Sequence, residues 1–259
     1  MAAIDVFLLG SLASLIAGLG TGLGALPIFL LRRMGVGLET TLLSLAAGIM
    51  LAASVFSLVM PALEVMAGRG ASPFGASVTV AAALMLGGGV FWIANRFIPH
   101  EHFFKGREGI DGVLTKRLWL FVAAITLHNF PEGLSVGAGF GQPDLGKGMA
   151  LAIGIAIQNM PEGFVVALAL VALRHSAAFA FMIALLTGLV EPVGGLIGAA
   201  AVAFVQPILP WALAFAAGTM IFVVGGEMIP ETHRKGHETR ATFGLLSGFA
   251  LMLLLGGLF

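Results

Sequence analysis

Residues 118–141 read LWLFVAAITLHNFPEGLSVGAGFG, an apolar stretch whose only acidic residue, Glu132, stands near its centre. The stretch is long enough to cross a bilayer as a helix, so it predicts a transmembrane span. A second stretch, residues 147–173, contains IQNMPEG at 157–163, which resembles LHNFPEG at 127–133. Consecutive spans run in opposite directions, so this repetition predicts a pseudo-two-fold axis in the membrane plane, a feature common in transporters.

The composition of the 259-residue chain also indicates a membrane protein, since 59% of its residues are hydrophobic and 10% are charged. Soluble domains carry about 25% charged residues, and disordered chains combine low hydrophobicity with high charge, so both classes are excluded. Thirteen basic and thirteen acidic residues balance, so no basic surface for nucleic acid is expected. Cysteine is absent, which excludes disulfides, a thiolate nucleophile and a cysteine metal site.

Apolar runs divide the chain into eight predicted spans. They lie at about 6–31, 40–65, 74–95, 118–141, 147–173, 177–204, 209–231 and 240–258. The first has no basic residue before it and is too long for the core of a signal peptide, so we expect it to be retained. The longest connection, about 96–117, is too short for a separate soluble domain, and residues 1–259 are expected to form a single transmembrane domain.

Basic residues are distributed unevenly between the two sides of these spans. The connections after the first, third, fifth and seventh spans hold eleven Lys and Arg residues, whereas the opposite side holds only Arg69 and Lys147. Because cytoplasmic loops carry the excess of basic residues, this asymmetry predicts that the 96–117 loop is cytoplasmic and that both termini lie outside.

Two weaker repeats extend the internal symmetry. The second and seventh spans share AAGxM, at 46–50 and 216–220, each followed by a proline, and the first and sixth share TGL, at 21–23 and 187–189. We therefore predict an all-α polytopic membrane protein of eight transmembrane helices, in which spans 1–3 and 6–8 form inverted repeats around a pseudo-symmetric pair of spans 4 and 5. Chance similarity between short apolar strings is the alternative explanation for these two matches.

Three glutamates lie near the predicted membrane midplane. Glu132, Glu162 and Glu191 are the 15th, 16th and 15th residues of their spans. A charge at that depth costs about 2.5–3.5 kcal/mol, so three cost roughly 8–10 kcal/mol, which is comparable to the whole net stability of a protein. Such a cost predicts a compensating cation, protonation or a wet cavity. Protonated carboxyls that join helices by hydrogen bonds are the structural alternative.

Polar side chains gather around two of these glutamates at helical spacing. On each span an imidazole or an amide lies four residues before the glutamate and shares its face, and an asparagine lies three residues before it. These residues are His128, Asn129 and Glu132 in one span and Gln158, Asn159 and Glu162 in the next. Pro131 and Pro161 each remove a backbone donor, so we expect a break in both helices beside the polar groups.

Together with Glu191, these side chains form a candidate cation site of one imidazole, two or three carboxylates and several amide oxygens. The ligand mix suits zinc and also manganese, iron(II), cobalt or cadmium. Bridging carboxylates could also hold two metal ions about 3.5–4 Å apart. Met50, near the middle of the second span, is either a core residue or a thioether ligand.

Polar residues away from this centre indicate an access route. At the predicted cytoplasmic end lie seven candidates for a metal exit path or a secondary metal site, namely Glu227, Glu231, His233, His237, His100, Glu101 and His102. Solvated loop side chains are the alternative for these histidines. Glu64, at the outer end of the second span, is a candidate for a cation entrance or a simple charge at a helix end.

The paired HNFPEG and QNMPEG motifs resemble the fourth and fifth helices of the ZIP (Zrt/Irt-like protein) metal transporters, in particular the bacterial GufA-like branch. Glu191-Pro192 and the segment EMIPETH at 227–233 resemble further parts of a pattern that covers essentially the whole chain. The resemblance implies eight helices in a bacterial inner (cell) membrane and uptake of divalent metal, chiefly zinc, into the cytoplasm. It implies no separate cofactor, and an elevator-like movement of one helix bundle past another, often in a homodimer.

The binuclear site of that family implies roles for individual residues. One metal ion would be held by His128, Glu132, Gln158, Glu162 and Glu191, with Met50 nearby, and a second by Asn129, Asn159 and the bridging glutamates. Many relatives have an acidic residue in place of Asn159 or a histidine in place of Gln158, so we expect a weaker second site. Gly226 stands where some relatives have a histidine, which argues against a metal role for Glu227.

Three other functions are compatible with these residues. A membrane-embedded metallo-hydrolase would use Glu132 or Glu162 as a base, although the sequence contains no HExxH motif. A proton- or sodium-coupled carrier of an organic solute would use the glutamates as proton relays. A metal channel would differ from a carrier in the absence of saturable transport.

Overall fold

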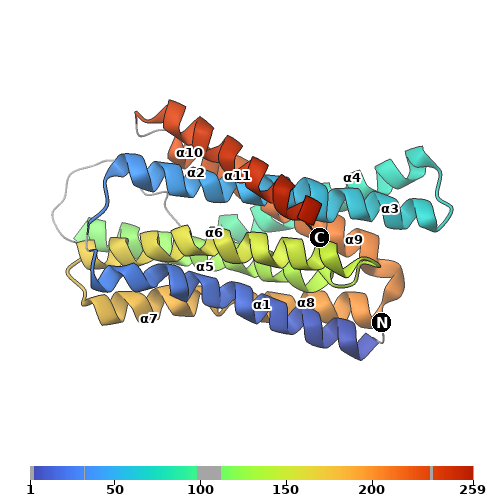
Figure 1. The fold of residues 1–259 in the computed structure, drawn as a ribbon, viewed down its shortest axis with the longest axis horizontal. Coiled ribbons are helices and arrows are strands. Elements are labelled where there is room, and N and C mark those ends of the chain that lie inside the picture. Colours follow the sequence, from blue (N-terminus) through green and yellow to red (C-terminus); the bar gives the residue numbers. More distant parts are fainter. Residues whose placement is uncertain (1–2, 32, 98–111, 234–235, 259) are drawn as a thin grey trace.

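The computed structural model describes residues 3–31, 33–97, 112–233 and 236–258, and every regular element in these ranges is a helix (Figure 1). The longer helices are α1 (Ala3–Ala25), α2 (Val36–Ala53), α4 (Pro73–Phe97), α5 (Gly112–Gly139), α6 (Leu145–Ala172), α9 (Leu209–Val223) and α11 (Glu238–Leu258). The shorter ones are η1 (Leu26–Phe29), η2 (Ser54–Val59), α3 (Met60–Gly68), α7 (Ala177–Gly188), α8 (Glu191–Phe204), η3 (Gln206–Ile208), η4 (Val224–Met228) and α10 (Ile229–Thr232).

The helices form two bundles that lie side by side along the long axis of the molecule (Figure 1). In the first bundle, α1 packs against α6, α7 and α8, and α5 packs against α8. In the second bundle, α2 packs against α11, and α4 packs against α9, which also contacts η2 and α3. The bundles meet where α2 contacts α6 and where α5 contacts α9, so the two motif-bearing helices α5 and α6 line the interface.

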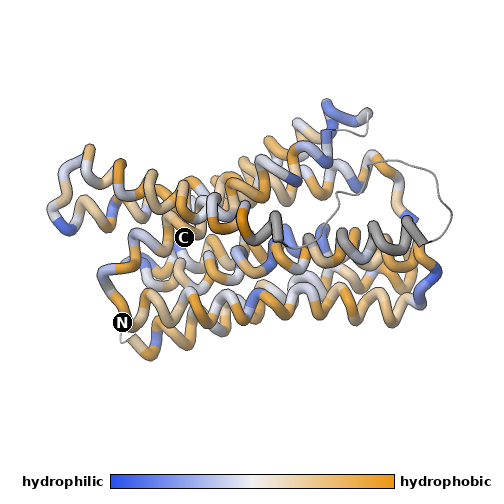
Figure 2. Tube along the Cα trace, turned by 180° about the vertical axis from the view of Figure 1, so that it is seen from behind, coloured by the Kyte–Doolittle hydropathy of each residue, from blue (hydrophilic) through white to orange (hydrophobic). Residues whose placement is uncertain are grey.

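The outer faces of both bundles are apolar, as a lipid environment requires. Figure 2 shows hydrophobic residues along the helices and hydrophilic residues mainly at helix ends and turns. Seven stretches in the described ranges are long and apolar enough to cross a membrane. They correspond to the predicted spans except 118–141, because the polar residues of α5 lower its mean hydropathy. A multi-pass membrane protein is therefore confirmed, whereas the count of eight spans and the inverted repeats stay predictions.

Several span boundaries differ from those expected. The stretch 177–204 is divided at Leu189–Val190, so Glu191 becomes the first residue of α8, next to Pro192 in its first turn. The helix α5 begins at Gly112, which removes residues 112–117 from the predicted 96–117 loop, and residues 98–111 lie outside the described ranges.

The expected breaks at the motif prolines do not occur. Pro131 and Pro161 lie inside continuous helices, α5 and α6. Each proline removes one backbone hydrogen bond, and packing against neighbouring helices holds the remainder of the helix in place. The helical irregularities are instead the π-helical segments η2 and η4, which are followed by Pro61 and Pro230 in the second and seventh predicted spans.

The glycine of each PEG motif lies at a close helix crossing. A Cβ atom on Gly133 would collide with the carbonyl oxygen of Glu191, and one on Gly163 would collide with the carbonyl oxygen of Thr21. Small residues at such crossings allow the backbones of membrane helices to approach closely. Gly133 thereby brings the start of α8, and with it Glu191, beside Glu132 on α5.

We expect Gly133→Ala to lower the free energy of unfolding by about 1–3 kcal/mol, because the added methyl group forces α5 and α8 apart. Gly89→Ala on α4 is the matched control, since no heavy atom in the described ranges lies within 4 Å of the added Cβ position. Reversible denaturation in mixed micelles measures both. Equal stability of the two variants would show that the α5–α8 crossing tolerates a side chain.

Candidate metal centre

Seven of the predicted site residues converge at the interface of α5, α6 and α8. The helix α5 contributes His128, Asn129 and Glu132, α6 contributes Gln158, Asn159 and Glu162, and α8 contributes Glu191. None of the seven is more than 7% exposed. The helical spacing therefore places all of these polar groups inside the molecule, although each of the three helices is otherwise apolar.

Amide side chains bridge the three helices through the carboxylates. Nε2 of Gln158 donates to Oε1 of Glu132 at 2.9 Å, which joins α6 to α5. Nδ2 of Asn159 donates to Oε1 of Glu191 at 2.6 Å, which joins α6 to α8, and also to the carbonyl oxygen of Ala17 on α1 at 2.8 Å. Two adjacent amides of α6 therefore orient carboxylates that belong to two neighbouring helices.

The three carboxylates are close enough to interact electrostatically. The charge of Glu132 is opposed by those of Glu162 and Glu191, and Glu191 is also opposed by Glu162. The positively charged form of His128 attracts the carboxylate of Glu162. The cluster thus concentrates negative charge in the protein interior, where the low dielectric constant strengthens both the repulsion and the attraction of any cation.

His128 also links the two bundles. Its Nε2 lies 2.7 Å from Oε2 of Glu227 in η4, and its ring lies 6.2 Å from that of Phe91 on α4. Glu227, predicted at a cytoplasmic exit, is 6% exposed and borders the central cluster. The structure therefore joins this residue to the centre, through a contact that spacing along the chain did not indicate.

A set of buried oxygens in the cluster lacks hydrogen-bond partners. Within the cluster, six side-chain oxygens are buried without a partner among the described residues, as is Nδ2 of Asn129; the oxygens are Oδ1 of Asn129, Oε2 of Glu132, Oε1 of Gln158, Oδ1 of Asn159, Oε2 of Glu162 and Oε2 of Glu191. Buried polar atoms are almost always paired, and six unpaired acceptors in one cluster are unfavourable without a positively charged group.

The remaining candidates have other surroundings. Met50 is 1% exposed and belongs to the apolar core. Glu64 pairs with Lys147 at one end of the bundles. His233 contacts Thr232, Thr242 and the carbonyl oxygen of Ile229, so it serves the local fold of its turn.

Glu231 and His237 are partly exposed near the same end as His233, and His100, Glu101 and His102 lie outside the described ranges. No group of three or more His, Asp or Glu side chains in the part of the chain that the structure describes is arranged to hold a metal ion. In this arrangement His128 pairs with Glu227, Glu132 with Gln158, and Glu191 with Asn159.

Comparison with known proteins identifies the family. Residues 111–256 match the family described as "ZIP Zinc transporter". The chain is 48% identical to "Zinc transporter GufA" of Myxococcus xanthus over 95% of its length and 97% of that protein. The chain belongs to the ZIP family. It is also 45% identical to "Zinc transporter ZIPB" of Bordetella bronchiseptica over 91% of its length and 76% of that protein.

More distant similarity extends to eukaryotes, since the ZIP chain is 31% identical to human "Zinc transporter ZIP11" over 82% of its length and 86% of that protein. The family consists of transporters, so the chain is a metal transporter of the GufA-like branch and not an enzyme, and the metallo-hydrolase alternative is excluded. The matched segment begins at α5 and includes every member of the central cluster of this ZIP chain.

Sequence reasoning missed several participants in the centre of this ZIP chain. The carbonyl oxygen of Ala17 accepts from Asn159, and Oγ of Ser135 lies 3.1 Å from Sδ of Met220. Ser135 shares a helix face with Glu132 three residues earlier, which is a signal that spacing could have supplied. The contact with Ala17 could not be predicted from the sequence, because every residue has a backbone carbonyl.

We expect His128 and Glu227 to be energetically coupled by about 1–3 kcal/mol, because removing either leaves a buried polar group without its partner. A double-mutant cycle of His128→Ala and Glu227→Ala, followed by denaturation in mixed micelles without metal, measures the coupling. The control cycle pairs His128→Ala with Ser77→Ala, whose exposed position on α4 is fourteen residues, about 21 Å along the helix, from the Phe91 ring that contacts His128. Additive effects within about 0.5 kcal/mol in both cycles would contradict a stabilising contact.

Proposed function

We propose that this ZIP chain transports divalent metal ions, with zinc as the leading substrate, into the cytoplasm through the buried cluster on α5, α6 and α8. Three of its relatives are named as zinc transporters, which supports the substrate class. The observation that carries the site is the set of six buried oxygens without hydrogen-bond partners among the described residues. A divalent cation would compensate these acceptors and the three carboxylates together.

Binding would proceed by exchange of partners within the cluster. The imidazole of His128 would leave Glu227 to coordinate the ion, while Glu132, Glu162 and Glu191 would supply charged oxygens and Gln158 its amide oxygen. Nitrogen and carboxylate oxygens are ligands that zinc prefers, and they also accept other first-row divalent ions. These ligands would offset the loss of the ion's hydration water, so no bare charge would be exposed to the membrane core.

A second ion would use the amide oxygens of Asn129 and Asn159 with the bridging glutamates. Asn159 already donates two hydrogen bonds, to Glu191 and to Ala17. Its amide hydrogens therefore offset part of the negative charge of Glu191, and less of that charge is left for a second cation to balance. We therefore propose that the first ion binds more tightly than the second.

The arrangement of the bundles supports a carrier with alternating access. The central cluster lies in the first bundle and reaches the second bundle through the contact of His128 with Glu227, so relative movement of the bundles would change which end of the molecule it faces. From His128 the polar groups continue through Glu227 to the partly exposed Glu231 and His233. We assign this end to the cytoplasm, with both termini outside, because the basic residues of the connecting segments gather there.

Zinc uptake into proteoliposomes tests the transport function. Wild type is expected to show saturable uptake, and Glu132→Ala/Glu162→Ala is expected to reduce it at least tenfold, because two of the three carboxylates that compensate the ion are lost. Glu238→Ala, at the exposed start of α11, is the matched control and should transport like wild type. Equal uptake by the double variant would remove the cluster from the transport path, and uptake that never saturates would indicate a channel.

Zinc should also stabilise the folded protein in the absence of any gradient. At a free zinc concentration 100 times its dissociation constant, the free energy of unfolding should rise by about 2.7 kcal/mol in wild type. Thermal unfolding in detergent with and without zinc measures this shift, which should disappear in Glu132→Ala/Glu162→Ala and persist in His233→Ala/His237→Ala. Retention in the first variant and loss in the second would place the dominant metal site at the cytoplasmic histidines.

A further inference from the structure

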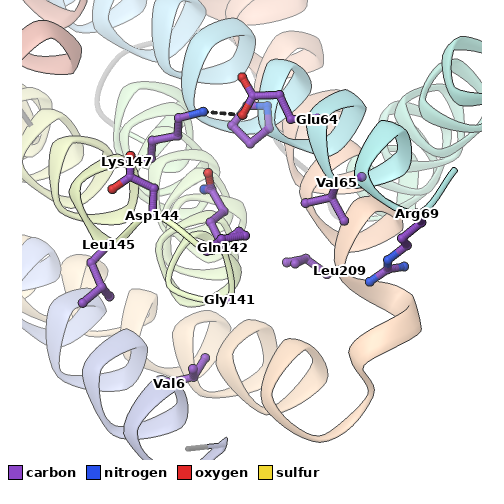
Figure 3. Close-up of a pocket in the computed structure, with 13 residues that line it drawn as sticks. Val6, Glu64, Val65, Arg69, Gly141, Gln142, Asp144, Leu145, Lys147 and Leu209 are labelled. Carbon is purple, nitrogen blue, oxygen red and sulfur yellow. Dashed lines mark hydrogen bonds and ion pairs between the residues drawn. The ribbon is translucent and has the colours of Figure 1, made fainter. Parts of the chain in front are cut away.

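A cavity of about 600 Å³ opens at the end of the bundles that carries the turn between α5 and α6 (Figure 3). Its walls come from both bundles. Val6 on α1, Gln142 in the α5–α6 turn and Lys147 on α6 belong to the first bundle, and Glu64 on α3 and Leu209 on α9 belong to the second. The cavity therefore marks the place where the two bundles would separate if this end of the interface opened.

Two polar contacts cross the cavity between the bundles. Nζ of Lys147 donates to Oε2 of Glu64, as the dashed line in Figure 3 shows. Nε2 of Gln142 donates to the carbonyl oxygen of Ser57 in η2 at 3.0 Å. Pro61 has no amide hydrogen to offer that carbonyl, so the irregular helix leaves an acceptor that the opposite bundle can use. Gln142 is 2% exposed, so its contact is shielded from water.

The cavity does not continue to the central cluster. Leu151 and Ile155 follow Lys147 on the same face of α6, both are fully buried, and they belong to the same apolar core as Met50 and Leu58 of the second bundle. Glu162 lies fifteen residues beyond Lys147, about 22 Å along the helix. An ion in the cavity is thus separated from the cluster by an apolar barrier.

We propose that Lys147 and Gln142 are positioning residues that hold this end of the bundle interface closed, through a clasp formed by the Lys147–Glu64 and Gln142–Ser57 contacts. Release of the clasp lets the bundles part over Leu151 and connects the cavity with the central cluster. The proposal rests on the proposed function, since a clasp across the bundles regulates access only if the bundles move relative to one another.

The strength of the clasp suits a contact that breaks in every transport cycle. Lys147 and Glu64 side chains are 34% and 59% exposed, and exposed ion pairs change an equilibrium by a factor of roughly one to five. The shielded Gln142 contact adds to this factor. Together the two contacts favour the closed form over the open form by a small factor. Both forms therefore stay populated, as a carrier that alternates between them requires.

Cysteine labelling tests the clasp directly, because the chain contains no cysteine of its own. The probe is Leu151→Cys, one helical turn below Lys147, in full-length protein reconstituted in proteoliposomes and treated with a membrane-impermeant maleimide. Lys147→Glu and Glu64→Lys each place like charges opposite one another. Each is expected to raise the labelling rate at least threefold, and the double charge swap is expected to return it to within twofold of the parent.

Two further variants guard against misfolding and general loosening. Gln142→Leu removes the shielded donor without adding charge and should also raise labelling of Leu151→Cys. Ala180→Cys, fully buried within the first bundle, is the control thiol and should label at the same slow rate in every background. Unchanged labelling of Leu151→Cys in all variants, or a swap that labels as fast as the single reversals, would overturn the clasp.

The labelling experiment needs no metal, so it can contradict the clasp without contradicting metal transport through the central cluster, and the uptake experiment can do the reverse. Zinc uptake that does not depend on Glu132 and Glu162 overturns the proposed function whatever the labelling shows. If uptake depends on those residues while labelling is indifferent to charge reversal and to Gln142→Leu, the transport function stands and the clasp is wrong.

Discussion

Carboxylates buried inside an apolar membrane bundle are the constraint on which the rest of this structure depends. Three glutamates occupy positions where an unpaired charge is expensive, and the protein surrounds them with amides and one imidazole from neighbouring helices. These partners satisfy one oxygen of Glu132 and one of Glu191 and leave the other oxygen of each unpaired among the described residues. The cluster is therefore stable enough to fold and retains the acceptors that a transported cation requires.

Close backbone packing makes this cluster achievable in a membrane. Polar side chains that bridge helices require the helix axes to be near one another, and large residues at the crossings would prevent that approach. Each motif glutamate is followed directly by a glycine. Gly133 packs against a backbone carbonyl of α8, and Gly163 packs against one of α1. The PEG sequence thus combines two functions in adjacent residues, since the glutamate supplies the charge and the glycine allows a neighbouring helix to approach closely.

Much of this arrangement follows from the sequence. Apolar length predicted the seven stretches of the described ranges that can cross a membrane, and i, i+4 spacing grouped His128 with Glu132 and Gln158 with Glu162 on shared faces. The contact of His128 with Glu227 was not predictable, because η4 is π-helical and a wider turn changes which residues face the partner helix. Packing between helices determines where α7 is divided from α8 and why α5 continues through Pro131. Composition alone does not predict this packing.

The two sets of polar contacts between the bundles differ in a way that bears on transport. His128 and Glu227 meet in a buried setting beside the central cluster, where a bound ion would compete for the imidazole. Lys147 and Glu64 meet at a water-filled end, where solvent competes for both partners. An ion at the centre would thus weaken the inner contact through ligand exchange, while the outer contact would depend on the distance between the bundles. The His128–Glu227 contact responds to ion binding, and the Lys147–Glu64 contact responds to bundle movement. The two events can therefore be coupled although no single contact is both strong and easily broken.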